Sequence, residues 1–164
     1  MTILELAMEK ERDAESYYRE LAGKTDDSGL QSILNKLATV EAKHFQAIQK
    51  LKEEGGDVEV DGGDDRKEMQ SLFTEWDKQA QMVDSSTSEV DLYKIAQDRE
   101  TEAREFYLEK ADETGSPQGS TLFHQLADQE LMHYQILDTI IEHVSRPEPG
   151  NWLENAEWYH HEEY

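Results

Sequence analysis

The chain has 164 residues, enough for one domain with a substantial core, and contains no cysteine, which excludes disulfides and cysteine-ligated metal sites. Its 38 acidic and 16 basic residues give a formal net charge of −22, so repulsion by phosphate opposes binding to nucleic acid or to an anionic membrane surface. The sequence shows neither a leader-like N-terminus nor an apolar run long enough to span a membrane, and we therefore expect a cytoplasmic protein.

The first half of the chain predicts two helices joined by a short turn. A capping box at Thr2 and helically spaced apolar residues up to Gly23 predict a helix over about residues 3–22. Ser28 opens a second helix, which continues until Gly55. Because the connection is short, we expect the two helices to be antiparallel.

The connection that follows, over about residues 55–87, is too long for a tight turn. It must carry the chain back along the first pair before a second pair starts. A short amphipathic helix is predicted within it from five apolar positions: Leu72, Phe73, Trp76, Ala80 and Val83.

The acidic start of this connection also resembles a calcium-binding EF-hand loop. Five residues of the stretch 57–68 fall at positions 1, 3, 5, 6 and 12 of such a loop: Asp57, Glu59, Asp61, Gly62 and Glu68. Glu59 is longer than position 3 prefers, and Asp64 stands where these loops pack an apolar residue. We therefore favour a flexible acidic connector over a calcium site.

The second half predicts another antiparallel pair. A third helix begins near Ser88 and ends before Gly115, and a fourth begins at Pro117 and ends before Pro147. The expected fold is an all-α bundle of four helices, formed by residues 1–146 in two antiparallel pairs joined by one long crossover.

The last residues, 147–164, form a tail that is rich in aromatic and acidic side chains. Its large apolar residues are Trp152, Leu153, Trp158, Tyr159 and Tyr164. So much aromatic area favours burial, and we expect residues 151–159 to dock on the bundle or across a dimer interface. His160 and His161 can bind adventitious metal, but solvent-exposed tail histidines are the simpler interpretation.

The two predicted helix pairs are copies of one another at an offset of 89 residues. Matching residues include Ala14 with Ala103, Tyr18 with Tyr107, Glu11 with Glu100, Glu41 with Glu130, and His44 with His133. One pair alone cannot enclose a buried site, so the repeat indicates that the two pairs pack on each other.

Within this repeat, each half carries one glutamate and, thirty residues later, a Glu-x-x-His motif. The six residues are Glu11, Glu41, His44, Glu100, Glu130 and His133. Residues three apart share a helical face, so each motif can point both of its side chains into one cavity. Four carboxylates in a bundle core repel one another unless cations neutralise them, and two divalent ions balance four such charges.

The alternative is a metal-free bundle with polar residues in its core. The short motif is weak evidence by itself, because about one copy is expected by chance and a third copy, Glu157 with His160, lies in the tail. Two copies on predicted helices, each with a glutamate on the partner helix, favour the metal site. His124 lies out of phase with His133 and is expected to face outward.

These motifs resemble the ferritin-like superfamily, and within it the rubrerythrin-like branch. The similar segments are Glu11-x-x-Ala14-x-x-Tyr17-Tyr18, Leu37-Ala38-x-x-Glu41-x-x-His44, Glu100-x-x-Ala103-x-x-Phe106-Tyr107 and Leu126-Ala127-x-x-Glu130-x-x-His133. The resemblance covers roughly residues 3–145. It implies an up-down-down-up ferritin-like bundle with a non-haem di-iron site, in a homodimer or larger assembly.

Residue roles follow from the same resemblance. Carried over by position, Glu41 and Glu130 are expected to be the carboxylates closest to bridging, Glu11 and Glu100 to be terminal or chelating ligands, and His44 and His133 to bind one iron each. Tyr18 and Tyr107 are expected either to hydrogen-bond to ligand carboxylates or to be ordinary core aromatics.

The implied function is an oxidoreductase that reduces peroxide or dioxygen at two iron ions, with an external redox protein as electron donor. A ferroxidase that takes ferrous iron as substrate is the alternative, and manganese or zinc also suits carboxylate and imidazole ligands. The chain departs from rubrerythrins in having no cysteine-ligated iron domain. It also has no additional glutamate one turn from Glu100, where Ala96, Gln97, Ala103 and Arg104 stand.

Overall fold

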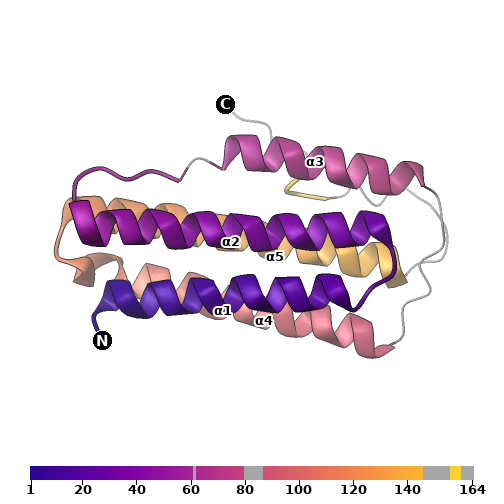
Figure 1. Ribbon diagram of the computed structural model, residues 1–164, viewed down its shortest axis with the longest axis horizontal. Coiled ribbons are helices and arrows are strands. Elements are labelled where there is room, and N and C mark those ends of the chain that lie inside the picture. Colours follow the sequence, from indigo (N-terminus) through magenta and orange to yellow (C-terminus); the bar gives the residue numbers. More distant parts are fainter. Residues whose placement is uncertain (61, 80–86, 146–155, 160–164) are drawn as a thin grey trace.

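The computed structural model describes residues 1–60, 62–79, 87–145 and 156–159. Its elements are helices α1 (Ile3–Gly23), α2 (Ser28–Glu54), α3 (Gly63–Lys78), α4 (Thr87–Lys110), a 3-10 turn η1 (Ala111–Thr114) and α5 (Pro117–Ser145) (Figure 1). The predicted all-α fold is confirmed, since the described chain is helical and contains no strand.

Local signals fix the helix ends. The Thr2 side chain accepts a hydrogen bond from the amide of Glu5 at the start of α1, as the capping box predicts. Helix α2 begins at Ser28, as predicted, and the side chain of the preceding residue, Asp27, accepts the capping hydrogen bond from the amide of Leu30. Asp27 has an extended backbone there and its carboxylate reaches the third amide of the helix, which is the geometry of an N-cap.

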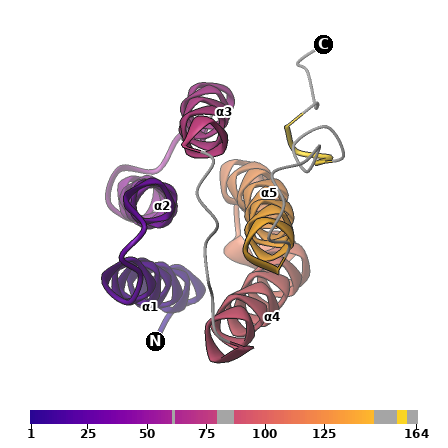
Figure 2. The ribbon, with the colours of Figure 1, turned by 90° about the vertical axis from the view of Figure 1, so that its right-hand side faces the viewer.

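The four long helices form two hairpins, α1 with α2 and α4 with α5, packed side by side (Figure 2). Helix α1 lies against α4, and α2 lies against α5. Figure 1 shows the chain running forward in α1, back in α2, back again in α4 and forward in α5, the up-down-down-up order. Helix α3 lies outside the bundle on α2 and returns the chain to the end where α4 begins.

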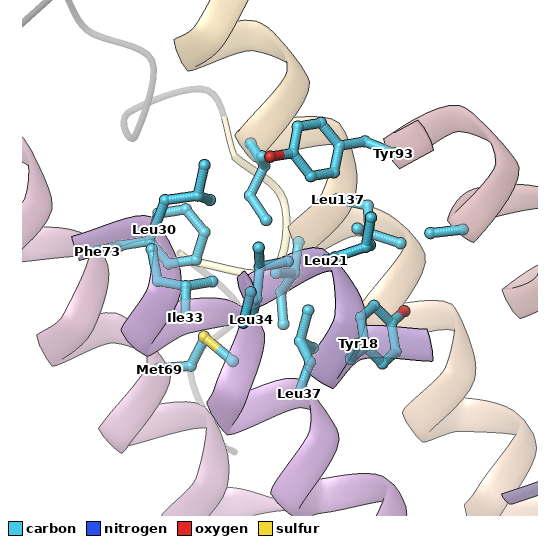
Figure 3. Packing of buried hydrophobic residues seen from close by; sticks show 14 of the residues in the cluster. Tyr18, Leu21, Leu30, Ile33, Leu34, Leu37, Met69, Phe73, Tyr93 and Leu137 are labelled. Atoms are coloured by element: carbon cyan, nitrogen blue, oxygen red, sulfur yellow. The ribbon is translucent and has the colours of Figure 1, made fainter. Parts of the chain in front are cut away.

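The apolar core is divided into two clusters along the bundle axis. The first lies near the α1–α2 turn and includes Leu30, Ile33 and Leu34 of α2, packed against Phe73 of α3 and Leu137 of α5 (Figure 3). The second lies toward the opposite end and is built from Ala7, Ile48, Leu51, Val58, Tyr107, Ala111, Leu122, Phe123, Leu126 and Ala127. Each long helix places one buried glutamate between its residues of the two clusters.

Residues 156–159 of the tail dock on α3 and α5 of the same chain. Trp158 is 1% exposed, its indole N–H donates to Thr139 Oγ1 at 2.9 Å, and its ring lies 4.9 Å from that of Phe73. The backbone carbonyl of Tyr159 accepts a hydrogen bond from Gln70 at 2.6 Å. Residues 151–155 and 160–164, which hold the other tail aromatics and both tail histidines, lie outside the described residues.

Helix α3 is longer at its start than the amphipathic helix predicted from the apolar residues. It begins at Gly63, so Glu68 lies in its second turn and pairs with Lys36 of α2 at 2.5 Å. Asp65 lies 2.8 Å from both Lys36 and Lys43. Lysine ammonium groups thus form ion pairs with these carboxylates. Among the described residues of the stretch 57–68, no group of side chains is arranged to bind a metal ion. Ala80 and Val83 lie outside the described residues.

None of the described helices combines the length with the apolar character that a membrane span requires.

Candidate metal centre

The structure brings the six predicted ligands together midway along the bundle, between the two apolar clusters. All six are buried, with exposed fractions of 3% or less: Glu11, Glu41, His44, Glu100, Glu130 and His133. All four long helices contribute residues at the same height along the bundle axis. Helices α1 and α4 each supply one glutamate, and α2 and α5 each supply a Glu-x-x-His motif. The duplicated sequence therefore produces a site with approximate two-fold symmetry.

The ligand atoms divide into two overlapping groups of four, each with its atoms within 4.8 Å of one another. One group is Glu11, Glu41, His44 and Glu130, and the other is Glu41, Glu100, Glu130 and His133. Glu41 and Glu130 belong to both groups, whereas each remaining residue belongs to one. Shared and unshared ligands of this kind are what two adjacent ions need.

Each histidine points its Nδ1 atom at carboxylates of both hairpins. His44 Nδ1 lies 3.1 Å from Glu130 and 3.4 Å from Glu11. His133 Nδ1 lies 2.7 Å from Glu41 and 3.6 Å from Glu100. The two imidazole rings are nearly parallel, 9° apart, with centroids separated by 5.8 Å. Two imidazole nitrogens thus approach the shared carboxylates from equivalent directions.

Each of the six residues presents a buried atom that makes no hydrogen bond of suitable geometry among the described residues, although the two Nδ1 atoms lie close to carboxylate oxygens. These atoms are Glu11 Oε2, Glu41 Oε1, His44 Nδ1, Glu100 Oε2, Glu130 Oε1 and His133 Nδ1. A buried polar atom without a partner destabilises a fold by about 1–3 kcal/mol, and a charged one by more. Oxygen and imidazole donors gathered in this way fit divalent first-row cations.

Two buried tyrosines orient the unshared carboxylates. The Tyr18 hydroxyl on α1 donates to Glu100 Oε1 on α4, and the Tyr107 hydroxyl on α4 donates to Glu11 Oε1 on α1. Burial, and then the carboxylate partner, raises the pKa of both phenols well above its usual value, so both remain protonated donors. Of the two roles open to these residues, the structure shows the hydrogen-bonding one.

Burial and crowding act differently on the shared and unshared carboxylates. Burial, followed by repulsion from Glu11 and Glu100, raises the pKa of Glu41 well above its usual value, and burial and the same kind of repulsion raise that of Glu130. Burial also opposes ionisation of Glu11, but attraction to His44 and the hydrogen bond from Tyr107 contribute to a lowered pKa. The metal-free cluster therefore disfavours charge most at the two carboxylates that both groups share.

A cleft of about 170 Å³ leads from the surface between α1 and α4 to these ligands. It reaches all four glutamates, and its wall includes Ala14 and Ala103. In the sequence these alanines stood out only as partners in the 89-residue repeat and as members of the family motifs. The two positively charged side chains at the cleft, Lys10 and Arg99, were missed, although they too are related by the 89-residue repeat.

Histidines and motifs outside the centre behave differently. His124 is exposed on α5, as its helical phase predicts. Glu157 of the third Glu-x-x-His motif is exposed and accepts a hydrogen bond from Gln135 at 3.2 Å. Its partner His160 lies outside the described residues.

Comparison with known proteins agrees with the residue motifs. The rubrerythrin family model matches residues 2–141, which include all six clustered residues and both tyrosines. Neither the comparison with curated proteins nor the comparison with solved structures found a match. A match over most of the chain, on a helical bundle with buried carboxylates and imidazoles at its centre, shows that this protein belongs to the rubrerythrin family of the ferritin-like superfamily.

Proposed function

We propose that the protein is a non-haem di-iron oxidoreductase that reduces hydrogen peroxide or dioxygen. The observation that carries this proposal is the pair of overlapping ligand groups, in which Glu41 and Glu130 are shared and His44 and His133 are not. The family match supports the same conclusion. These groups would hold two ferrous ions, which when bound would supply the two electrons that, with two protons, convert hydrogen peroxide to two waters.

The protein's own contribution is fixed geometry and a protected interior. Tyr18 donates a hydrogen bond to one oxygen of Glu100, and Tyr107 donates one to an oxygen of Glu11. The second oxygen of each carboxylate is left for an ion. The apolar clusters on both sides of the centre exclude bulk water from the bundle interior. The cleft between α1 and α4 provides a path from the surface to the four glutamates.

Restoring the reduced state requires electrons from outside the chain. The 164 residues hold no cysteine that could ligate a second redox centre of the iron–sulfur or rubredoxin type. We therefore propose that a separate redox protein is the electron donor.

Iron oxidation is the second candidate function, favoured by the ratio of four carboxylates to two imidazoles and by the net charge of −22. Hard oxygen ligands and an acidic surface attract ferrous ions. A ferroxidase turns over many ferrous ions per chain with dioxygen, whereas an oxidant reductase keeps its two ions and consumes peroxide or dioxygen with an external reductant.

Two measurements test the proposal together. Iron content is measured for the wild type, for Glu41→Ala and Glu130→Ala, and for Glu157→Ala as a matched control in the exposed third motif. We expect about two irons per chain, lost in the first two variants and retained in the control. Stopped-flow oxidation of the ferrous protein should then be faster with peroxide than with dioxygen for a peroxidase. Repeated turnover of added ferrous iron indicates a ferroxidase, and iron content unaffected by either ligand variant contradicts both functions.

A further inference from the structure

The cleft between α1 and α4 is built from the repeated sequence in a regular way. Apart from Glu41 and Glu130, all of its lining residues belong to these two helices. Ala14 follows Glu11 by three residues and Ala103 follows Glu100 by three, so each alanine lies one helical turn from a ligand. Both alanines are partly buried and line the cleft. Their methyl groups leave space that any larger aliphatic side chain fills.

Two cation–aromatic pairs cross from one helix to the other beside this space. The Lys10 ammonium of α1 lies 5.0 Å from the centroid of the Phe106 ring of α4. The Arg99 guanidinium of α4 lies 4.6 Å from the centroid of the Tyr17 ring of α1. The pairs are equivalent under the 89-residue repeat, and Lys10, Arg99 and Tyr17 all line the cleft. Each pair thus forms a side-chain bridge across the gap between the helices.

These side-chain bridges can open by side-chain motion alone. Cation–π contacts at partly exposed sites are weak, and exposed side chains change rotamer on the picosecond to nanosecond scale. The backbone of α1 and α4 need not move for a small molecule to pass. A bulky molecule, in contrast, must displace the cation–aromatic contacts that border its path.

The charges at the cleft wall balance locally although the chain is strongly acidic. Lys10 and Arg99 bring two positive charges, and Asp13 and Glu102 bring two negative ones. Counting these four side chains, the outer wall carries no net charge, while the whole chain carries −22. By their net charge these four groups therefore neither attract nor repel an entering molecule, and the width of the cleft is left to decide what passes.

We propose that this cleft admits a small neutral oxidant of the size of hydrogen peroxide, with Ala14 and Ala103 setting its width and the Lys10–Phe106 and Arg99–Tyr17 pairs excluding larger hydroperoxides. The proposal rests on the di-metal function proposed above. It assigns specificity to side chains that bind no metal.

The first test measures access without turnover, through the rate at which azide binds to the diferric protein, followed by its charge-transfer absorbance. In Ala14→Leu/Ala103→Leu, azide association should slow about tenfold while iron content stays at the wild-type value, because added methylenes in a tight space raise the barrier to passage. Ala42→Leu, at a partly buried alanine on α2 outside the cleft, is the control and should bind azide at the wild-type rate.

A second variant protects this test against misfolding. Ala103→Val adds less volume, and it should give a smaller decrease in the azide rate in a protein that keeps its iron. Unchanged azide association in the iron-loaded leucine or valine variants would overturn the proposal. A wild type that binds no iron would instead overturn the proposed function, so the two failures are distinguishable.

The second test removes the cations of the two side-chain bridges. In Lys10→Met/Arg99→Met the oxidation rate with cumene hydroperoxide should rise about threefold relative to that with hydrogen peroxide, because weak contacts no longer hold the gap closed. Lys50→Met, at an exposed lysine of α2, is the control for a lost positive charge. A ratio of the two rates that matches the wild type would contradict the role given to these pairs.

Discussion

The hydroxyl group of Tyr18 on α1 donates a hydrogen bond to Glu100 on α4, so a residue of the first hairpin orients a predicted ligand of the second. Tyr107 does the same in reverse for Glu11. These two bonds join the hairpins at the level of the centre, where the surrounding residues are carboxylates and imidazoles. They make each half of the proposed site depend on the other.

Removing both phenol hydroxyls should weaken metal binding without abolishing it. In Tyr18→Phe/Tyr107→Phe we expect the affinity for iron to fall about tenfold to a hundredfold, the range found when partners of ligand residues are lost. Competition with a calibrated chelator measures this effect. Tyr93→Phe is the control, since Tyr93 is a buried tyrosine of α4 for which the described residues show no hydrogen bond to a ligand. Equal affinities in the wild type and the double variant would contradict the orienting role.

The metal-free centre should oppose folding. In Glu41→Gln/Glu130→Gln the isosteric amides remove the two charges that burial disfavours most. We expect the metal-free variant to melt at a higher temperature than the metal-free wild type, by about 2–4 °C for each kcal/mol of relieved repulsion. The wild type should gain stability on adding iron, whereas the variant should gain little.

Calorimetry with and without metal checks both parts of this prediction. Glu157→Gln serves as the control because Glu157 is exposed in the tail. A metal-free variant that melts below the metal-free wild type would show that the four carboxylates are compatible in the absence of cations.

The ion pairs of Asp65 should give stability that depends on pH. Burial opposes ionisation of Asp65, but hydrogen bonds from Lys36 and Lys43 lower its pKa below the usual value. Because the folded-state pKa is depressed, the stabilisation is present above the unfolded-state pKa of about 4 and is lost as the pH falls through the folded value. We expect Asp65→Asn to destabilise metal-free protein by about 2 kcal/mol at pH 7.

Urea unfolding at pH 7 and near pH 3 tests this account. The difference between wild type and Asp65→Asn should shrink at the lower pH. Glu68→Gln is the control, and because its side chain is 63% exposed its effect at pH 7 should be about 0.5 kcal/mol or less. A difference that is independent of pH would assign the loss to packing rather than to the ion pairs.

The docked tail should stabilise the bundle without contributing to the metal centre. Trp158→Ala removes a buried indole and its hydrogen bond to Thr139, and such truncations cost about 3–5 kcal/mol. We expect a lower melting temperature and unchanged iron content. Deletion from Asn151 onward should have a similar effect, and a deletion that leaves both stability and oligomer size unchanged would show that the docking contributes nothing.

Helices and their pairing could be read from the sequence because the signals are local and repeated. The 89-residue repeat, the capping box at Thr2 and the glycines at the ends gave the four long helices and their order. The Glu-x-x-His spacing placed each glutamate and histidine on one helical face, and the structure brings all six residues together.

Contacts between distant segments could not be predicted in the same way. The crossed bonds of Tyr18 and Tyr107 depend on how far α1 slides along α4, and helical phase alone does not fix that register. Docking of Trp158 depends on the position of α3, whose Phe73 ring contacts the indole. Lys10 and Arg99 gave no signal as single charged residues, because their role arises only when each faces an aromatic ring of the other helix.

The most direct test of the central claim is a crystal structure of the iron-loaded protein with anomalous scattering data collected at the iron edge. We expect two iron peaks about 3.5–4 Å apart, both contacted by Glu41 and Glu130, with His44 bound to one and His133 to the other. A single peak, or iron bound elsewhere while these six side chains remain without metal, would contradict the assignment.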